Sequence, residues 1–561
     1  MSDTTADLIL IGGRVRTPSD PSGFAEAIAI RGGLIQAVGA DADIRDLAGP
    51  RTRVIDLAGR LALPAFGDSH VHAINGGLES LRCNMLGLKT RQACLDTIAA
   101  YCAGLPADAW VLGGGWSMEA FPGGTPTAAD LDLVTGGRPA FLPNRDHHGA
   151  WVNTAALARA GVDATTPDPS DGRIERHPDG SPTGTLHDGA MAVVARCVPS
   201  ATAAELRAGL TAALEYLHGN GIAHYQDACV GTAGELAISD TFGTYLDAAR
   251  DGSLTASVTG ALWWDRHRGA AQYEDLLARR EQTLGEADGG RFRATSVKLM
   301  LDGVCETFTA AMGMPYLDKH GHPTDHHGNY FIDPDELKTI TKRLSGEGFQ
   351  LHFHALGDGA VTAGLDALAE LPAAERQVGR HHLAHLQFIK PSDMDRFAAL
   401  GAVANFQPLW AMADPQMLEL TLPFVGPERY QWQYQIGGLA QRGTRLAFGS
   451  DWPVSSGDPL QEMHVAVNRV LSHVLGRPGT PECEDPFLPG QAVTIDTAIT
   501  AFTEGVAYVN HEEDVTGRLL PGMRADVVVL DQDLFAIPAT DIGDTSAVLT
   551  VANGQVVHGD E

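Results

Sequence analysis

From residue 200 onward, helix-like amphipathic stretches alternate with short apolar runs, and this alternation constrains the fold more than any other feature. "TAAELRAGLTAALEYLHGNG" is followed by "IAHYQDA", and "TYLDAARDG" is followed by "LTASVTGALWW". Such alternation predicts a parallel sheet covered by helices. Together with "ALPAFGDSHVH" nearer the start, the chain holds eight strand candidates, at 62–72, 222–228, 254–264, 293–303, 348–358, 380–388, 401–408 and 444–453.

The number of these strands favours an α/β fold of the TIM type, a (β/α)8 barrel. An open doubly wound sheet more often carries a glycine-rich phosphate turn, and neither GxGxxG nor GxxxxGK[ST] follows any strand candidate. Roughly 120 residues separate the first two strand candidates, whereas the usual connection has only a few residues. We therefore predict a large insertion after the first barrel strand, an inserted subdomain or lid at about 80–198.

Both ends of the chain are rich in short β-type runs. "AIAIRGGLIQAVG" near the start and "AVLTVANGQVVHG" near the end have turns of the hairpin type. We predict that the two ends pair into one small β domain and that the barrel is inserted between its halves. The predicted boundaries are 1–62 and 512–561 for these halves and 63–511 for the barrel with its insertion.

Composition excludes several classes of protein. The formal net charge of -30, with no basic stripe, argues against binding to nucleic acid or to anionic membranes. No uninterrupted apolar run is long enough to cross a bilayer, and the N-terminus lacks the features of a secretory signal, so we expect a cytoplasmic protein. The seven cysteines are scattered and form no CxxC pair, which indicates reduced thiols and no cysteine zinc site.

Residue types that bind metals stand at or near the ends of five strand candidates. Because the carboxyl ends of the strands converge on one mouth of such a barrel, we expect these side chains to meet. They are His70 and His72 on the first strand, Lys298 within the fourth, His354 on the fifth with His352 as a competitor, His385 on the sixth with His381 and His382 as competitors, and Asp451 on the eighth. The spacing of His70 and His72 places both imidazoles on one strand face, where they can bind one cation together or simply hydrogen-bond at the rim.

Lys298 is a cation among Val, Leu and Met in "SVKLMLDG". Burial there would lower the pKa of the amine and make it nucleophilic. A neutral lysine can take up carbon dioxide to form a carbamate, whose two oxygens can bridge two divalent cations. The alternatives are a side chain that reaches solvent or one that pairs with Asp302.

Asp451 follows an apolar strand, where a carboxylate can touch a metal and accept a proton from bound water, or else cap the following turn. Four imidazoles, a carbamate and one carboxylate suit zinc, with manganese or iron as the second choice.

These residues lie in motifs that resemble those of the amidohydrolase superfamily, specifically its YtcJ-like branch, which includes N-substituted formamide deformylases. The motifs are GDSHVH at 67–72, SVKLMLDG at 296–303, HALGD at 354–358, HLAHLQ at 382–387 and GSDWPV at 449–454, and "GRLLPGMRADVVVLD" at 517–531 is similar to the closing segment of the family. The resemblance implies a β-sandwich formed by both termini beside the barrel. It also implies a binuclear metal site made of His70, His72, carbamylated Lys298, His354, His385 and Asp451.

The insertion carries two further motifs of that branch, "RDHHGAWVNTAAL" at 145–157 and "TGTLHDGA" at 183–190. His147 replaces the glycine expected before His148, and Asp188 stands where the branch usually has glutamate. We expect the substrate to be contacted by His148, Trp151, Asp188 and Trp410, with Trp116 and Trp452 as further candidates for an apolar pocket. The histidine-rich loop at 320–327 is predicted to be exposed.

The predicted function is hydrolysis of a carbon–nitrogen bond in a small molecule, an amide, formamide or N-acyl compound, by a hydroxide that two divalent cations generate from water. Alternatives with the same metal shell are hydrolysis of a lactone, ester or cyclic amide, or deamination; a metal-binding protein without turnover is a further alternative. The oligomeric state stays open, with a homodimer as one option.

Overall fold

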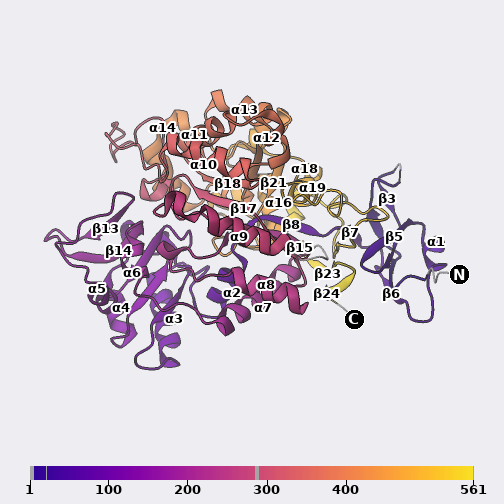
Figure 1. The fold of residues 1–561 in the computed structure, drawn as a ribbon, viewed down its shortest axis with the longest axis horizontal. Coiled ribbons are helices and arrows are strands. Elements are labelled where there is room, and N and C mark those ends of the chain that lie inside the picture. The colour runs from indigo at the N-terminus through magenta and orange to yellow at the C-terminus, as the bar shows by residue number, and fades with distance from the viewer. Residues whose placement is uncertain (1–4, 21, 285–289, 560–561) are drawn as a thin grey trace.

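The computed structural model describes residues 5–20, 22–284 and 290–559, and its centre is a sheet of eight parallel strands (Figure 1). In sheet order the strands are β21 (Leu446–Phe448), β20 (Val403–Phe406), β19 (His382–His385), β18 (Gln350–Ala355), β17 (Phe292–Met300), β16 (Ser257–Trp263), β15 (Ile222–Val230) and β8 (Phe66–Val71). Each of the eight strand candidates overlaps one of these strands, so the barrel is confirmed.

The two edge strands of this sheet meet at their carboxyl ends. The backbone N–H of Asp451, just after β21, donates to the carbonyl of His70 on β8 over 2.7 Å. The Ser450 hydroxyl donates to the carboxylate of Asp68 over 2.5 Å. These contacts bring the first and last barrel strands side by side, and with them the metal-binding residue types of both.

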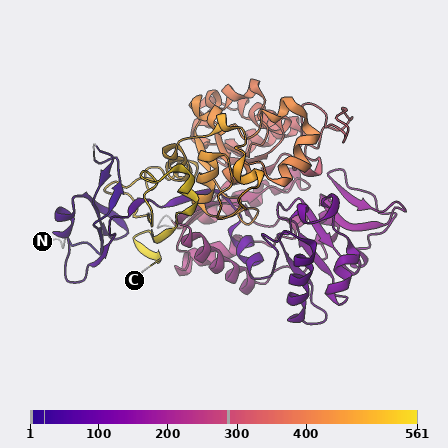
Figure 2. The ribbon, with the colours of Figure 1, turned by 180° about the vertical axis from the view of Figure 1, so that it is seen from behind.

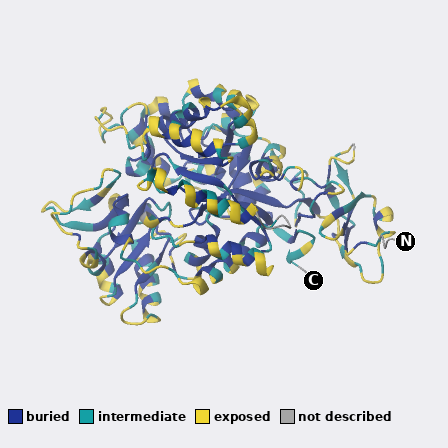
Figure 3. Ribbon diagram, viewed as in Figure 1, coloured by how far each residue is buried: buried dark blue, intermediate teal, exposed yellow. Residues whose placement is uncertain are grey.

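Helices cover the barrel, with apolar faces inward and exposed faces outward (Figure 3). They include α7 (Ala203–Gly219), α8 (Phe242–Asp251), α9 (Tyr273–Leu284), α10 (Pro334–Gly346), α11 (Asp358–Ala369), α13 (Met394–Leu400), α15 (Ile436–Gln441), α16 (Pro459–Asn468) and α18 (Ile495–Phe502). Helix α7 begins with a capping box, in which Thr202 and Glu205 each accept the other's backbone N–H. It packs on α2 (Ala73–Ser80) so closely that a Cβ at Gly77 would lie 1.9 Å from the Gly209 carbonyl oxygen. This contact positions α2, which starts directly after His72.

Both termini build one β-sandwich, as predicted. One sheet has the order β5 (Leu34–Gly39), β4 (Ala27–Arg31), β1 (Leu8–Ile11), β6 (Arg53–Asp56). The other has the order β24 (Gln555–His558), β23 (Ala547–Ala552), β22 (Val527–Leu530), β7 (Leu61–Pro64), β2 (Arg14–Arg16), β3 (Phe24–Ala25). Ala62 on β7 is the antiparallel partner of Val529 on β22, which joins the two ends of the chain. Leu10 and Ile28 share a core with Val529 between the sheets.

The large insertion follows β8 and has a sheet and a core of its own. Its strands run in the order β13 (Gly172–Arg176), β14 (Pro182–Asp188), β12 (Gly149–Val152), β11 (Ala140–Pro143), β10 (Val111–Gly114), β9 (Cys83–Asn84). The helices α3 (Arg91–Ala103), α4 (Ala128–Thr135), α5 (Thr154–Ala160) and α6 (Met191–Ala195) pack with them. In both views the insertion and the β-sandwich lie at opposite ends of the molecule (Figures 1 and 2). Within the described residues no helix has the length and apolar character needed to cross a membrane.

Candidate metal centre

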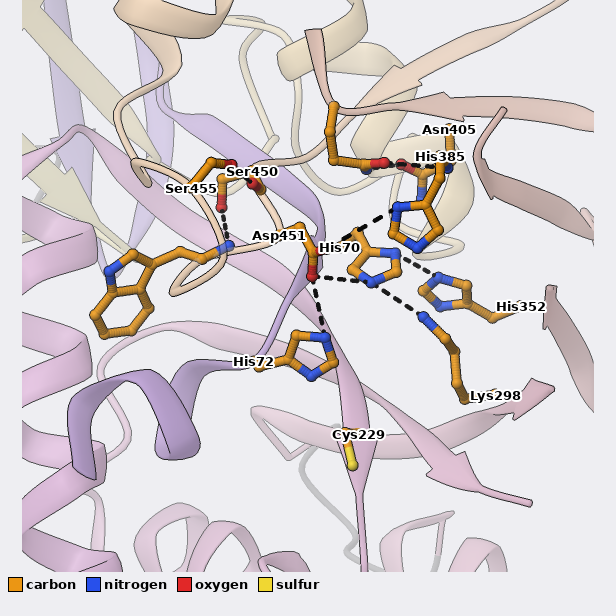
Figure 4. A network of polar contacts seen from close by, with 12 residues as sticks. His70, His72, Cys229, Lys298, His352, His385, Asn405, Ser450, Asp451 and Ser455 are labelled. Carbon is orange, nitrogen blue, oxygen red and sulfur yellow. Dashed lines mark hydrogen bonds and ion pairs between the residues drawn. The ribbon is translucent and has the colours of Figure 1, made fainter. Parts of the chain in front are cut away.

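Asp451 stands at the centre of a cluster of imidazoles at the barrel mouth (Figure 4). Its Oδ1 lies 3.1 Å from Nε2 of His72 and 3.3 Å from Nε2 of His70, and its Oδ2 lies 4.0 Å from Nδ1 of His385. Burial acts to raise the pKa of Asp451, but the close contacts with His70 and His72 outweigh it and hold this pKa well below its usual value. The carboxylate is therefore ionised and faces both histidines of the HxH pair.

Lys298 lies on the other side of His70, with 3.0 Å between its Nζ and the Nε2 of His70 (Figure 4). Its side chain does not reach solvent, since the residue is only 1% exposed. Nor is Asp302 its partner, because that carboxylate accepts the backbone N–H groups of Ala311, Leu356 and Gly357. Burial lowers the pKa of Lys298 to about 8, which makes a neutral amine accessible near neutral pH.

Replacing Lys298 by methionine should stabilise the metal-free protein at pH 7. A lysine whose pKa falls from 10.5 to about 8 on folding costs about 3 kcal/mol below pH 8, where both states carry the proton. That cost disappears between pH 8 and 10.5, because there the folded state has lost the proton that the unfolded state still holds. Chemical unfolding of both chelator-treated proteins at pH 7 and pH 10 should therefore show a gain that shrinks at the higher pH. An equal gain at both pH values would contradict this account.

The position of His354 separates it from its competitor His352. Lys298, His352 and His382 are register partners on adjacent strands and lie at one depth in the barrel. His354 comes two residues later, one layer nearer the mouth, and its ring centroid lies 4.5 Å from that of His385. At the deeper level, Nε2 of His352 is 2.9 Å from Nδ1 of His70. The cluster at the mouth thus includes His354, and His352 supports it from below.

All six sequence-predicted ligands meet at this mouth: His70, His72, Lys298, His354, His385 and Asp451. Ligand atoms of His70, His72 and Asp451 lie within 4.8 Å of one another, the sole such group of histidine, cysteine and acidic residues found in the described ranges. His385 and Asp451 adopt left-handed backbone conformations, with φ of 77° and 55°. Strain of this kind concentrates at functional sites.

The donor set fits a divalent metal. Burial lowers the pKa of His70 to about 3 and holds the pKa values of His354 and His385 well below the usual range. These imidazoles are therefore neutral, the form that binds cations. The buried Nδ1 atoms of His72 and His385 have no hydrogen-bond partner among the described residues. A donor set of several nitrogens and one carboxylate suits zinc and similar cations rather than magnesium or calcium.

Two cavities meet at this cluster. The smaller one has a volume of about 70 Å³, and all six cluster residues line it. The larger one has a volume of about 410 Å³ and is lined by His354 and Asp451 together with Trp410. His148 of the insertion lines both cavities. A substrate at the cluster would therefore extend into one or both of these spaces.

His148 is held by Asp188, with 2.6 Å between the imidazole Nδ1 and the carboxylate Oδ1. Burial opposes protonation of His148, but Asp188 outweighs it and raises the pKa of this imidazole. His147 also lines the smaller cavity, and its Nε2 lies 3.3 Å from Oε1 of Glu79 on α2. The backbone φ of His147 is 62°, a conformation that glycine adopts without cost and that costs other residues about 1–2 kcal/mol. This explains why glycine is expected at that position.

Of the two tryptophans predicted to contact the substrate, Trp410 lies at the site and Trp151 lies in the core of the insertion. The predicted substrate contact at Trp151 is not seen, because this side chain is fully buried in the core of the insertion against Trp116 and Phe121 and lines neither cavity. Its indole N–H donates to the carbonyl of Thr127 over 2.7 Å. Trp410 does line the larger cavity, and its ring stacks on His385 at 5.2 Å.

The histidine-rich loop is exposed at all four of its histidines: His320, His322, His326 and His327. Three of them make local contacts, such as that of His326 Nε2 with the carbonyl of Phe308 at 2.6 Å.

Two buried carboxylates support the cluster and were not predicted as site residues. Asp302 ties together the loops after β17 and β18 and lies 3.4 Å from Nδ1 of His354. Asp68 accepts the backbone N–H groups of His70 and Ser450, which joins β8 to the segment that carries Asp451. Contacts of this kind orient metal ligands. Their sequence signal is an aspartate inside the "GDSHVH" and "KLMLDG" motifs themselves.

Comparison with known proteins identifies the family. The model of the amidohydrolase family matches residues 53–558. The chain belongs to the amidohydrolase family. A relative of this amidohydrolase, protein LONG AFTER FAR-RED 3 of Arabidopsis thaliana, is 29% identical over 99% of this chain and 92% of the relative. The N-substituted formamide deformylase of Arthrobacter pascens is 25% identical over 98% of this chain and 97% of its own.

A solved structure shares the fold of this amidohydrolase. An uncharacterized metal-dependent hydrolase from Pyrococcus furiosus superposes with a TM-score of 0.69 at 24% identity, covering 94% of this chain and 99% of the other. The barrel and the β-sandwich of this chain are thus a fold that the solved structure shares.

Proposed function

We propose that the protein is a metal-dependent hydrolase that cleaves a carbon–nitrogen bond of a small-molecule amide, formamide or N-acyl compound. The observation that carries this proposal is the meeting of four imidazoles and a buried lysine around one ionised carboxylate, at the junction of two cavities. Kinship with the N-substituted formamide deformylase supports the choice of bond.

The metal would be held by His70, His72, His354, His385, Asp451 and Lys298 as its carbamate, with zinc as the first choice and manganese or iron as the second. A bound divalent cation lowers the pKa of water and polarises a carbonyl oxygen. The depressed pKa of Lys298 supports the carbamate, because the neutral amine is the form that combines with carbon dioxide.

Asp451 is the proposed catalytic residue for proton transfer. It lines both cavities, so its carboxylate is accessible to a substrate in either one. In the proposed reaction Asp451 accepts a proton from the attacking water and then passes it to the leaving nitrogen, so that an acid and an amine are released. His148 is proposed to donate a hydrogen bond to the substrate from its Nε2, because Asp188 fixes the opposite ring nitrogen. Trp410 provides an apolar wall beside His385.

The experiment that tests this function is product analysis with zinc-loaded protein on N-formyl amines, N-acetyl amines and cyclic amides. Release of acid and amine in equal amounts is the expected result. Release of ammonia would indicate a deaminase, and turnover confined to lactones or esters would indicate an ester hydrolase. Either outcome would overturn the proposed bond specificity. Absence of turnover across the panel with zinc, manganese and iron would overturn the proposed function.

A further inference from the structure

The larger cavity offers room for more than the reacting group of a small amide. Its volume of about 410 Å³ lies within the range of about 300–1,000 Å³ that is usual for drug-sized ligands, whereas the smaller cavity has only about 70 Å³. It is continuous with the reaction centre, because Asp451, His354 and His148 line both it and the smaller cavity. A group attached to the scissile bond can therefore extend into it.

We propose that this cavity binds a long, uncharged apolar arm of the substrate. The inference rests on the proposed function and narrows its substrate class to amides that carry one extended hydrocarbon substituent, either on the carbonyl carbon or on the nitrogen.

The lining of the larger cavity is suited to hydrocarbon. Leu356, Leu409, Trp410, Met412 and Met417 contribute apolar surface from the loops that follow β18 and β20. Two of these are methionines, whose flexible thioether chains adapt to chains of different shape. Burying hydrocarbon against such a surface is favourable in proportion to the area removed from water.

Charged side chains in the same wall are already engaged with the protein. Glu306 accepts a hydrogen bond from Thr421 over 2.9 Å, and Asp414 accepts a backbone N–H of its own loop over 2.8 Å. Arg145 donates to the side-chain oxygen of Gln416 over 2.5 Å, which links the insertion to the barrel. Because these three groups already have partners in the protein, a charged arm would be buried beside them without an ion pair to offset its desolvation. An uncharged arm avoids this cost.

Two leucines of this lining are exposed to solvent. Leu86 of the insertion and Leu475 of the loop after α16 line the cavity and are nevertheless 37% and 44% exposed. Leu86 comes from the insertion and Leu475 from the barrel. Apolar side chains exposed at the edge of a cavity are typical of a ligand entrance. The smaller cavity, by contrast, is lined in part by a charged side chain. This is Arg266, which forms an ion pair with Asp171 at 2.7 Å.

Two homologous series test the length of the arm with the zinc-loaded protein, N-methyl amides from formyl to octanoyl and N-alkyl formamides from methyl to octyl. We expect kcat/KM to rise about two- to fourfold per added methylene in one series, because each buried methylene adds to transition-state binding. The series that rises identifies the side that carries the arm. If the shortest members are hydrolysed and neither series rises, this inference is overturned and the proposed function stands. If no member is hydrolysed, the proposed function fails as well.

Leu86→Glu and Leu475→Glu test the site itself, with Leu133→Glu as the matched control. Leu133 lies on α4 of the same insertion and is 77% exposed, so all three changes place a carboxylate on an exposed leucine and spare the core. For the octyl or octanoyl substrate, kcat/KM should fall at least about tenfold in the two cavity variants and stay unchanged in the control. For the shortest substrate Leu133→Glu should match the parent protein, and the two cavity variants should lose less activity than they lose on the long substrate. Equal behaviour of the cavity variants and Leu133→Glu on the long substrate would overturn the proposal.

Discussion

Asp451→Asn should lower kcat by about a thousandfold or more and leave the fold intact. The carboxylate is the proposed proton acceptor, and general acid–base catalysis contributes typically about 10²–10⁴-fold. Asparagine has nearly the same shape but cannot take up the proton. Steady-state kinetics with zinc-loaded protein measures the loss, and circular dichroism with thermal unfolding checks the fold.

Asp458→Asn is the matched control for this substitution. Asp458 lies seven residues further on and caps α16 by accepting the backbone N–H of Leu460 over 2.9 Å. Asparagine caps helices about as well as aspartate, so this variant should keep both its stability and its turnover. Near-normal turnover in Asp451→Asn would assign the proton transfer to another group.

Lys298→Ala should abolish metal binding and activity together. The proposed carbamate on this lysine would supply oxygen ligands to the metal, and alanine can neither form it nor replace these oxygens. Loss of contacts that only support a metal ligand typically costs about 10–100-fold in metal affinity, so loss of a ligand should exceed that range. Metal analysis after gel filtration and the same kinetic assay measure the two effects on one sample.

Bicarbonate provides the internal control for the carbamate. Metal-free parent protein should regain activity faster when zinc is supplied with bicarbonate, because the carbon dioxide in equilibrium with it modifies the neutral amine. Lys298→Ala should show no response to bicarbonate. Unchanged metal content in the variant, together with retained turnover, would refute the carbamate and leave the imidazoles and Asp451 as the whole site.

Much of the site was accessible from the sequence because two periodicities determine it. The strand period of two places His70 and His72 on one face of β8, and the alternation of strands and helices places the ends of β8, β17, β18, β19 and β21 at one mouth. The choice of His354 was different. His352 and His354 share a strand face, so their spacing could not separate them, and only the resemblance to the amidohydrolase superfamily preferred His354.

The motif that contains Trp151 did not determine on which side of the strand its side chain lies. Trp151 lies three residues after His148, whose ring lines both cavities, yet its own side chain fills the core of the insertion. On a strand such as β12, successive side chains point to opposite faces, and which face is covered depends on elements that pack from elsewhere in the chain. Trp410, by contrast, stands after a barrel strand and reaches the cavity, because every barrel strand ends at the mouth.

The sequence by itself determined the barrel, the sandwich of the two termini, the place of the insertion and the residue types at the strand ends, because these follow from local periodicity and composition. The tertiary structure alone decided how deep each side chain lies in the barrel and which side chains it contacts. His354 lies one layer nearer the mouth than His352, and Lys298 contacts His70 and not Asp302. Lys298 and His70 are 228 residues apart in the chain, and only the closure of the sheet brings their nitrogens to 3.0 Å. Contacts of this kind depend on the register and tilt of several strands at once, which no local pattern of residues encodes.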